Sequence, residues 1–168
     1  MPKRILLTGA TGFVGRNVLP VLKEYFDVDA PSRADLNLQD DEAVRAFVKS
    51  GSYDIVVHAA NPSPGKNQLD APERLFAESM RAYFNLRRNM CFFGRMFYLG
   101  SGAEYDKRRD LEMVTEDMIG QSLPIDDYGF AKFLMNEDAR CHEKVTNLRI
   151  FGCYGPTDAK TKFIRDAI

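Results

Sequence analysis

The chain has 168 residues, the length of a single domain with a sizeable core, and its 23 basic and 24 acidic residues give a net charge of −1. This balance provides no field that would favour binding to nucleic acid or to an anionic membrane surface. No apolar run approaches the roughly 20 residues of a membrane span and the N-terminus lacks the apolar region of a signal peptide, so we expect a cytoplasmic protein whose partners include neither nucleic acid nor membrane.

Residues 4–18 predict a strand, a tight glycine turn and the start of a helix. The apolar run at 5–7 is typical of a strand buried on both faces of a parallel sheet, and residues 13–26 have helical periodicity. Between them, Gly9, Gly12 and Gly15 are spaced by three residues. Such a turn allows backbone conformations barred to other residues, close approach to a pyrophosphate, and an anion at the helix start. We interpret it as a nucleotide-binding turn; a plain strand-to-helix connection is the alternative.

A second strand is expected over 28–30, and Ser32 and Arg33 follow where the adenosine ribose of a dinucleotide would lie. An acid at this place would bind a 2′-hydroxyl, whereas a planar guanidinium suits a 2′-phosphate. The sequence therefore favours NADP, with NAD possible. An exposed loop arginine is the alternative, and Asp29 or Asp35 could still serve as the ribose acid.

A third short segment at 36–38 is counted as a strand, and its last two residues, Asn37 and Leu38, could flank an adenine ring. Either residue of the pair Asp40–Asp41 can cap a helix over 42–50.

The next buried strand is expected over 54–60. Its final residues, Ala59 and Ala60, are small and leave room for a cofactor to cross the edge of the sheet. His58 lies inside this strand, and we interpret it as a hydrogen-bonded core histidine. The loop at 61–65 follows the carboxyl end of the strand, the side on which open α/β sheets bind ligands.

A long helix is expected over 72–92, followed by a strand that begins at Met96 and ends in Gly-Ser-Gly-Ala-Glu-Tyr at 100–105. Small residues with one hydroxyl, Ser101, at the carboxyl end of a strand indicate a site rather than a core. Residues 106–124 are charged and irregular, and we interpret them as a solvated loop.

The following helix, expected over 127–143 with Asp126 or Asp127 as its cap, carries Tyr128 and Lys132 on one face. A tyrosine with the ordinary pKa of about 10 is a poor base at neutral pH, and an ammonium one turn away favours the phenolate. The pair predicts proton transfer; a surface pair is the alternative.

A sixth strand is expected over 148–151, and residues 157–168 begin an apolar helical pattern without completing it. Strands and helices alternate throughout, which predicts an α/β fold with a doubly wound parallel sheet. Three cysteines, an odd number, fit unpaired thiols in a reducing compartment better than a disulfide framework, and the two histidines lack zinc-site spacing from them. We expect no metal site.

The order of motifs resembles the extended short-chain dehydrogenase/reductase family, the NAD(P)-dependent epimerase/dehydratase group that mostly acts on nucleotide sugars. The matching motifs are TGATGFVG at 8–15, HAA at 58–60, the serine four residues before Tyr105, YGFAK at 128–132 and YGP at 154–156. The resemblance implies a Rossmann fold spanning 1–168.

The resemblance also implies roles for individual residues. Tyr128 would move the proton, Lys132 would lower the tyrosine pKa and hold the nicotinamide ribose, and Ser101 would hydrogen-bond the reacting carbonyl or alcohol. The residues expected to bind the cofactor are Gly9, Thr11, Gly12, Phe13, Val14, Gly15, Ser32, Arg33, Asn37, Leu38, Ala59, Ala60, Tyr128 and Lys132.

Departures from the family pattern narrow the class of reaction that the sequence predicts. Ala103 stands where similar dehydratases carry an acid and fucose synthases a cysteine, and in a strand-like segment Glu104 would aim at the opposite side. We therefore favour a 4-keto reductase or 4-epimerase over a dehydratase. The segment SRADLNL at 32–38 is most similar to NADP-linked fucose synthases. Ser79 and Gly152 replace asparagines that are usual in the family.

Family members continue with a smaller C-terminal region that supplies most sugar-nucleotide contacts, so 157–168 is expected to be the start of an incomplete substrate region. We expect these 168 residues to bind a dinucleotide but to turn over little alone. A homodimer through the helices at 72–92 and 127–143 is expected by analogy. The alternative function is a non-catalytic dinucleotide sensor or scaffold.

Overall fold

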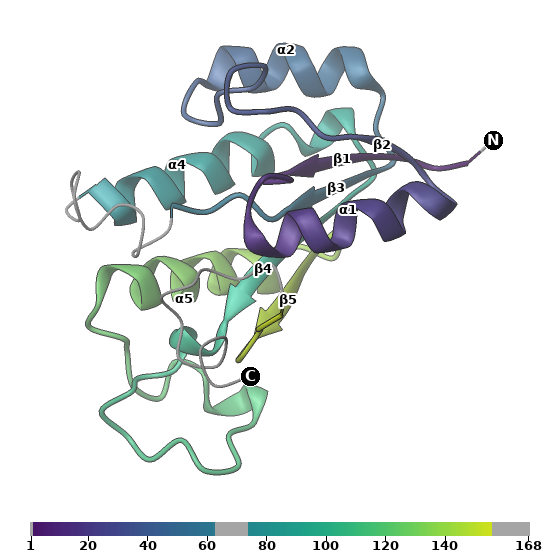
Figure 1. The fold of residues 1–168 in the computed structure, drawn as a ribbon. Helices are drawn as coiled ribbons and strands as arrows, with labels where there is room; N and C mark the ends of the chain where they lie inside the picture. The colour runs from purple at the N-terminus through teal and green to yellow at the C-terminus, as the bar shows by residue number, and fades with distance from the viewer. Residues whose placement is uncertain (1, 63–73, 156–168) are drawn as a thin grey trace.

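A computed structural model of the chain describes residues 2–62 and 74–155. Within them, one parallel sheet of five strands has the order β2-β1-β3-β4-β5 (Figure 1). The strands are β1 (Arg4–Thr8), β2 (Asp27–Asp29), β3 (Ile55–His58), β4 (Arg95–Ser101) and β5 (Val145–Ile150).

The helices lie on both faces of the sheet. They are α1 (Phe13–Tyr25), α2 (Asp41–Gly51), α4 (Leu75–Arg87) and α5 (Asp127–Arg140), with the 3₁₀ turns η2 (Met90–Phe92), η3 (Gly102–Glu104) and η4 (Glu116–Met118). The chain reverses its direction across the sheet after β2. Because parallel crossovers are right-handed, this reversal places α1 on one face and α2, α4 and α5 on the other (Figure 1). The predicted doubly wound α/β sheet is confirmed.

The main core lies between the sheet and the face that carries three helices. Val44 of α2, Tyr83 of α4 and Met135 of α5 pack there against Val56 and Met96 of the central strands. All five side chains are almost completely buried. This packing holds α4 and α5 against each other and fixes α5 beside the end of β4.

Two aspartates start helices that were expected from the sequence. Asp40 Oδ1 accepts a hydrogen bond from Ala43 N at 3.0 Å, and Asp126 Oδ1 accepts one from Gly129 N at 2.8 Å. Each satisfies a backbone donor that has no partner within its helix. The second cap places Tyr128 in the first turn of α5.

Residues 36–38 do not form the predicted strand. Leu36 N donates to Ser32 O, Gln39 N donates to the side chain of Asn37, and Asp40 N donates to Asn37 O. These local bonds close successive turns that lead into α2, and Leu36 is buried in the core without joining the sheet. The strand predicted at 148–151 is therefore the fifth in the described part of the chain, and it begins earlier, at Val145.

Both long helices end before their predicted limits. Asn89 N donates to Leu86 O after α4, and Cys141 N donates to Asp138 O after α5. Such bonds to the third preceding residue tighten the last turn and stop the α-helix. The predicted start of the first helix at residue 72 lies outside the described residues, as does the segment 157–168.

Most of residues 106–124 are exposed, as predicted for a solvated loop, but the segment also contributes buried residues to a small second core. Asp106 is buried, and its carboxylate accepts hydrogen bonds from the Arg108 guanidinium and from Ser122 Oγ. These bonds hold the pKa of Asp106 below its ordinary value. Ile119 packs nearby against Phe133 of α5.

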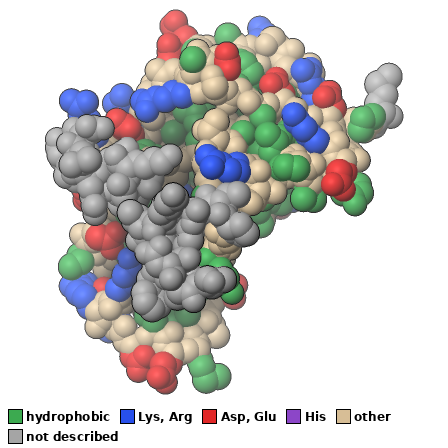
Figure 2. Space-filling view, in the orientation of Figure 1, with side chains coloured by type: hydrophobic (Ala, Val, Ile, Leu, Met, Phe, Trp, Pro, Cys, Tyr) green, Lys and Arg blue, Asp and Glu red, His purple; other side chains and the backbone are tan. Residues whose placement is uncertain are grey.

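The face shown in Figure 2 has basic and acidic side chains interspersed, as expected from the near-zero net charge. No described helix is both long and apolar enough to cross a membrane. The three cysteines are free and exposed. Residues 2–62 and 74–155 contain no group of three or more histidine, cysteine, aspartate or glutamate side chains able to hold a metal ion.

Candidate active site

The glycine turn connects β1 to α1 and packs against the end of β3. Gly9 has a positive φ of 76°, and a Cβ there would lie 2.4 Å from Ala60 N. A Cβ at Gly15 would lie 2.2 Å from Gly9 O, and Gly12 N donates to that same oxygen at 3.0 Å. Glycine at 9 and 15 is therefore required by close backbone approach. The structure brings the turn and the two alanines after β3 together.

The remaining predicted cofactor residues of this region lie in the glycine turn, in the first turn of α1 and in the segments after β2 and β3. Gly12 occupies the N-cap position of α1, and no side chain there hydrogen-bonds to the backbone N–H groups of the first turn. The first turn of α1 also contains no acidic residue. This composition is compatible with a bound anion. Thr11 and Asn37 are exposed, and Phe13, Val14, Leu38 and Ala59 are half-buried.

The two candidate ribose acids, Asp29 at the end of β2 and Asp35 in the loop that follows, both accept hydrogen bonds from within the protein. Asp35 Oδ2 accepts from Ser32 N at 3.0 Å and from Ser32 Oγ at 2.7 Å, which lowers the pKa of Asp35. Asp29 Oδ2 accepts from Tyr53 Oη at 2.5 Å. Arg33 is exposed, and its guanidinium has no hydrogen bond or ion pair with the described residues. Arg33 is therefore a charged group that this loop presents to solvent without a partner among the described residues.

His58 is a core histidine, as predicted. It is buried at the end of β3, and its Nδ1 lies 2.8 Å from Thr8 Oγ1. Burial and, to a smaller extent, the charge of Lys132 lower the pKa of His58 to about 3. The imidazole is therefore neutral at physiological pH.

This burial predicts a loss of stability in mild acid. Below its ordinary pKa of 6.5, the unfolded chain binds a proton at His58 that the folded chain excludes down to about pH 3. The free energy of unfolding should therefore decrease with falling pH, with a slope approaching about 1.4 kcal/mol per pH unit. Urea denaturation between about pH 6.5 and pH 5 measures the slope. His58→Leu should remove this component and His142→Leu should keep it; equal slopes in wild type and His58→Leu would contradict the assignment.

The predicted catalytic residues lie on β4 and α5. Lys132 is 4% exposed, and its Nζ donates to Leu99 O at 2.6 Å, two residues before Ser101. The same Nζ lies 5.9 Å from the centroid of the Tyr128 ring. Burial lowers the pKa of Lys132 to about 8, against a smaller opposing effect of Glu104. The structure thus brings the ammonium to the backbone at the end of β4 and beneath the tyrosine.

Ser101 is half-buried and begins η3 with a capping box. Its Oγ accepts from Ala103 N at 3.1 Å, and its own N–H donates to Glu104 Oε1 at 3.0 Å. The expectation that Glu104 occupies a strand-like segment was wrong, because β4 ends at Ser101 and a 3₁₀ turn follows. The S-x-x-E spacing of 101–104 is a known capping signal that could have identified this turn from the sequence.

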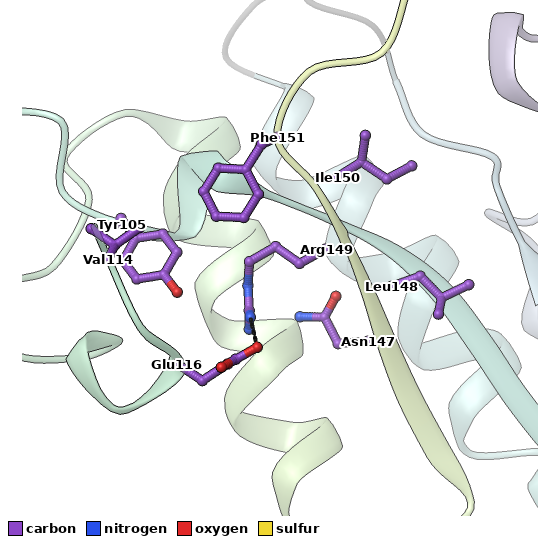
Figure 3. A pocket seen from close by; sticks show the side chains of 8 residues that line it. All are labelled: Tyr105, Val114, Glu116, Asn147, Leu148, Arg149, Ile150 and Phe151. Atoms are coloured by element: carbon purple, nitrogen blue, oxygen red, sulfur yellow. Dashed lines mark ion pairs between the residues drawn. The ribbon is translucent and has the colours of Figure 1, made fainter. Parts of the chain in front are cut away.

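Sequence reasoning missed the partner of Glu104. The Glu104 side chain is fully buried, and Arg149 Nε donates to its Oε2 at 2.7 Å. Beside this pair an open hollow of about 410 Å³ runs along β5, lined in part by Tyr105, Glu116 and Phe151 (Figure 3). None of the three predicted catalytic residues lines this hollow.

The three departures from the family pattern differ in their surroundings. Ala103 is buried in η3. Ser79 is buried on α4, and its Oγ has no hydrogen-bond partner among the described residues. Gly152 is exposed, and a Cβ there would meet nothing within 4 Å.

Comparison with known proteins connects the fold and these motifs. The sequence model of the NAD dependent epimerase/dehydratase family matches residues 5–168. GDP-L-colitose synthase of Yersinia pseudotuberculosis is 31% identical over 122 residues, which cover 69% of this chain and 39% of that protein.

Solved structures share the fold. GDP-mannoheptose C4 reductase from Campylobacter jejuni with NADP bound has a TM-score of 0.83 at 19% identity, over 94% of this chain and 54% of that one. dTDP-4-dehydrorhamnose reductase from Yersinia enterocolitica has a TM-score of 0.79 at 24% identity, over 98% of this chain and 58% of that one. The chain thus matches about half of each of these structures and less of the curated relative. Together with the glycine turn, the doubly wound sheet and the Tyr-Lys helix, the match over 5–168 shows that the chain belongs to the NAD-dependent epimerase/dehydratase family.

Proposed function

We propose that the chain is the dinucleotide-binding domain of an NADP-linked enzyme that reduces, or epimerises at C4, a nucleotide sugar. The observation that carries the proposal is the buried Lys132 ammonium, bonded to Leu99 O beside Ser101 and lying below the ring of Tyr128. A bound nicotinamide dinucleotide would supply the hydride. The names of the colitose synthase and of the heptose C4 reductase support this substrate class.

The glycine turn and the two alanines fit such a cofactor. Gly9 and Gly15 have no space for side chains, and Gly12 leaves the start of α1 without a side-chain cap. The backbone of this turn would hold the diphosphate, with Ala59 and Ala60 beside it. Ser32 and Arg33 would hold a 2′-phosphate.

Proton transfer would take place at the phenol oxygen of Tyr128. The ammonium of Lys132 lies 5.9 Å from the centroid of the Tyr128 ring, where its positive charge would stabilise negative charge that develops on the phenol oxygen during the transfer. The Ser101 hydroxyl uses its oxygen to accept from Ala103 N, so its own proton can be donated to a sugar carbonyl. In this scheme Ser101 would polarise the carbonyl, and Tyr128, assisted by Lys132, would deliver the proton.

The surroundings of Ala103 and Glu104 support reduction or epimerisation rather than dehydration. A methyl group at 103 supplies no acid for an elimination. The carboxylate of Glu104 is occupied by Arg149 and by Ser101 N. Neither residue offers a proton to a sugar.

The direct test of the cofactor site is a fluorescence titration of this chain with NADPH and NADH. We expect saturable binding of NADPH and weaker binding of NADH. Failure to bind either dinucleotide would contradict the proposed function.

Arg33→Ala should weaken NADPH binding by about 1–3 kcal/mol and leave NADH binding unchanged, because the guanidinium would make charge-assisted hydrogen bonds to the 2′-phosphate alone. Isothermal titration calorimetry with both dinucleotides measures the difference. Arg81→Ala, at an exposed position on α4, is the matched control and should change neither affinity. Equal losses for the two dinucleotides would show that Arg33 only shapes the loop.

We also propose a homodimer in which the surface between α4 and α5 is the interface. The rings of Phe76 and Phe130 stack there with centroids 5.8 Å apart, and Phe84 of α4 and Leu134 of α5 are also only partly buried. Sedimentation equilibrium of wild type and of Phe84→Glu tests this assignment, with a monomer expected for the variant. A wild-type monomer would contradict it.

A further inference from the structure

Glu104 and Arg149 form a buried ion pair next to the proposed catalytic residues. The carboxylate is 0% exposed, the arginine side chain is 12% exposed, and Nε lies 2.7 Å from Oε2. Asn147 Nδ2 lies 3.1 and 3.0 Å from the two carboxylate oxygens. Isolated buried charges are costly, so a carboxylate at this depth depends on these partners.

The pair is connected to the turn that carries Ser101. Glu104 Oε1 accepts from Ser101 N, and this bond closes the capping box at the end of β4. The carboxylate also packs closely against the backbone of β4, since a Cβ added at Gly100 would lie 2.4 Å from Glu104 Oε1. The orientation of the serine therefore depends on the carboxylate.

The pair is also connected to the helix that carries Lys132. Asn136, one helical turn further along the same face of α5, accepts with Oδ1 from Arg149 Nη2 and from Asn147 Nδ2, both at 3.0 Å. Lys132 itself is buried and bonded to Leu99 O. The same charged cluster thus contacts β4, α5 and β5.

We propose that Glu104 is a positioning residue of the active site: fixed by Arg149, its carboxylate holds the Ser101 turn and provides the counter-charge for the buried ammonium of Lys132. This inference rests on the roles proposed above for the serine and the lysine. Glu104 would then influence the reaction through Ser101 and Lys132 without contacting the substrate.

The other polar groups near Glu104 and Lys132 come from strands β3, β4 and β5 and from helix α5. Arg149 of β5 is bonded to the carboxylate and Tyr98 of β4 interacts with it electrostatically, while His58 of β3 and Tyr128 of α5 lie near the ammonium. Figure 3 shows Arg149 between Tyr105 and Asn147, with the exposed Glu116 paired to it at 3.9 Å from the solvent side. His58 is neutral, so within the described residues Glu104 is the charged group that acts on the Lys132 ammonium, where it raises the pKa against the effect of burial.

Titration of Lys132 tests the counter-charge. In the 168-residue chain with ¹⁵N-labelled lysine, the Nζ resonance assigned by Lys132→Arg reports the midpoint. Glu104→Gln should lower the midpoint by about one pH unit or more, because it removes the negative charge. The matched control Glu116→Gln removes the exposed carboxylate that faces the same arginine and should leave the midpoint unchanged. An unchanged midpoint in Glu104→Gln would overturn the proposal.

Hydrogen exchange tests the turn. Glutamine at 104 keeps an acceptor for Ser101 N–H, whereas methionine at 104 removes it. The Ser101 amide should therefore exchange slowly in Glu104→Gln and about tenfold faster or more in Glu104→Met. Equal exchange rates would overturn the proposal.

Since Gln or Met at 104 removes the buried ionic partner of Arg149, both variants are also made with Arg149→Met, which removes the second charge. Replacing a buried pair with apolar residues is often neutral in stability. Failure of these double variants to fold would show that the pair serves the core rather than the site, and would overturn the proposal. NADPH titration of the wild-type chain separates the two hypotheses. Absent binding contradicts the proposed function, whereas normal binding with an unmoved Lys132 midpoint contradicts the role of Glu104 alone.

Discussion

Replacing Tyr128 with phenylalanine is expected to lower turnover of a 4-keto nucleotide sugar by about 10²- to 10⁴-fold, the usual contribution of general acid–base catalysis. The substitution keeps the ring above the Lys132 ammonium and removes the phenol oxygen, so NADPH affinity should barely change. Stopped-flow oxidation of NADPH measures the rate, in a form of the protein that includes a substrate-binding region.

Tyr25→Phe, at an exposed tyrosine on α1, is the matched control and should keep full turnover. The result also separates the enzyme from a dinucleotide sensor, the function favoured by Ser79 and Gly152 in place of the family asparagines. A sensor has no use for a proton-transfer residue. Unchanged behaviour of Tyr128→Phe would therefore favour the sensor.

Gly9→Ala is expected to lower the free energy of unfolding by about 2–5 kcal/mol. Overpacking against the Ala59–Ala60 backbone contributes about 1–3 kcal/mol, and a Cβ at a φ of 76° adds about 1–2 kcal/mol. NADPH binding should be lost as well, because the turn must open to accept the methyl group. Urea denaturation with a parallel NADPH titration measures both effects.

Gly152→Ala provides the comparison, since a Cβ at that position meets no atom within 4 Å. Its free energy of unfolding should equal that of the wild type within experimental error. A Gly9→Ala variant as stable as Gly152→Ala would mean that the turn has more space than its contacts indicate.

Features that depend on neighbouring residues along the chain could be predicted from the sequence. The glycine spacing predicted the turn after β1, and Asp40 and Asp126 predicted the starts of α2 and α5. The spacing of Tyr128 and Lys132 predicted a shared helix face, and the structure has Nζ 5.9 Å from the ring. The catalytic roles of these residues remain predictions.

Features that depend on distant partners could not be predicted. Glu104 and Arg149 are 45 residues apart, and nothing local indicates that the two charges meet in the interior. The burial of Asp106 in the otherwise exposed segment at 106–124 could not be predicted for a related reason, because Ser122, which binds its carboxylate together with Arg108, is 16 residues away. Residues 36–38 were counted as a strand because an apolar alternation that short also fits a turn.

The Glu104–Arg149 pair has a consequence for the order in which the protein is assembled. β5 is the last described strand, and without it the carboxylate of Glu104 has no arginine and stays hydrated. On the ribosome, where folding proceeds from the N-terminus, the glycine turn can form while the Ser101 turn is still without support. The serine hydroxyl would then reach its final orientation only after residue 149 has emerged from the exit tunnel. The turn proposed to bind the nucleotide would thus form before the serine proposed to act in the reaction is in place.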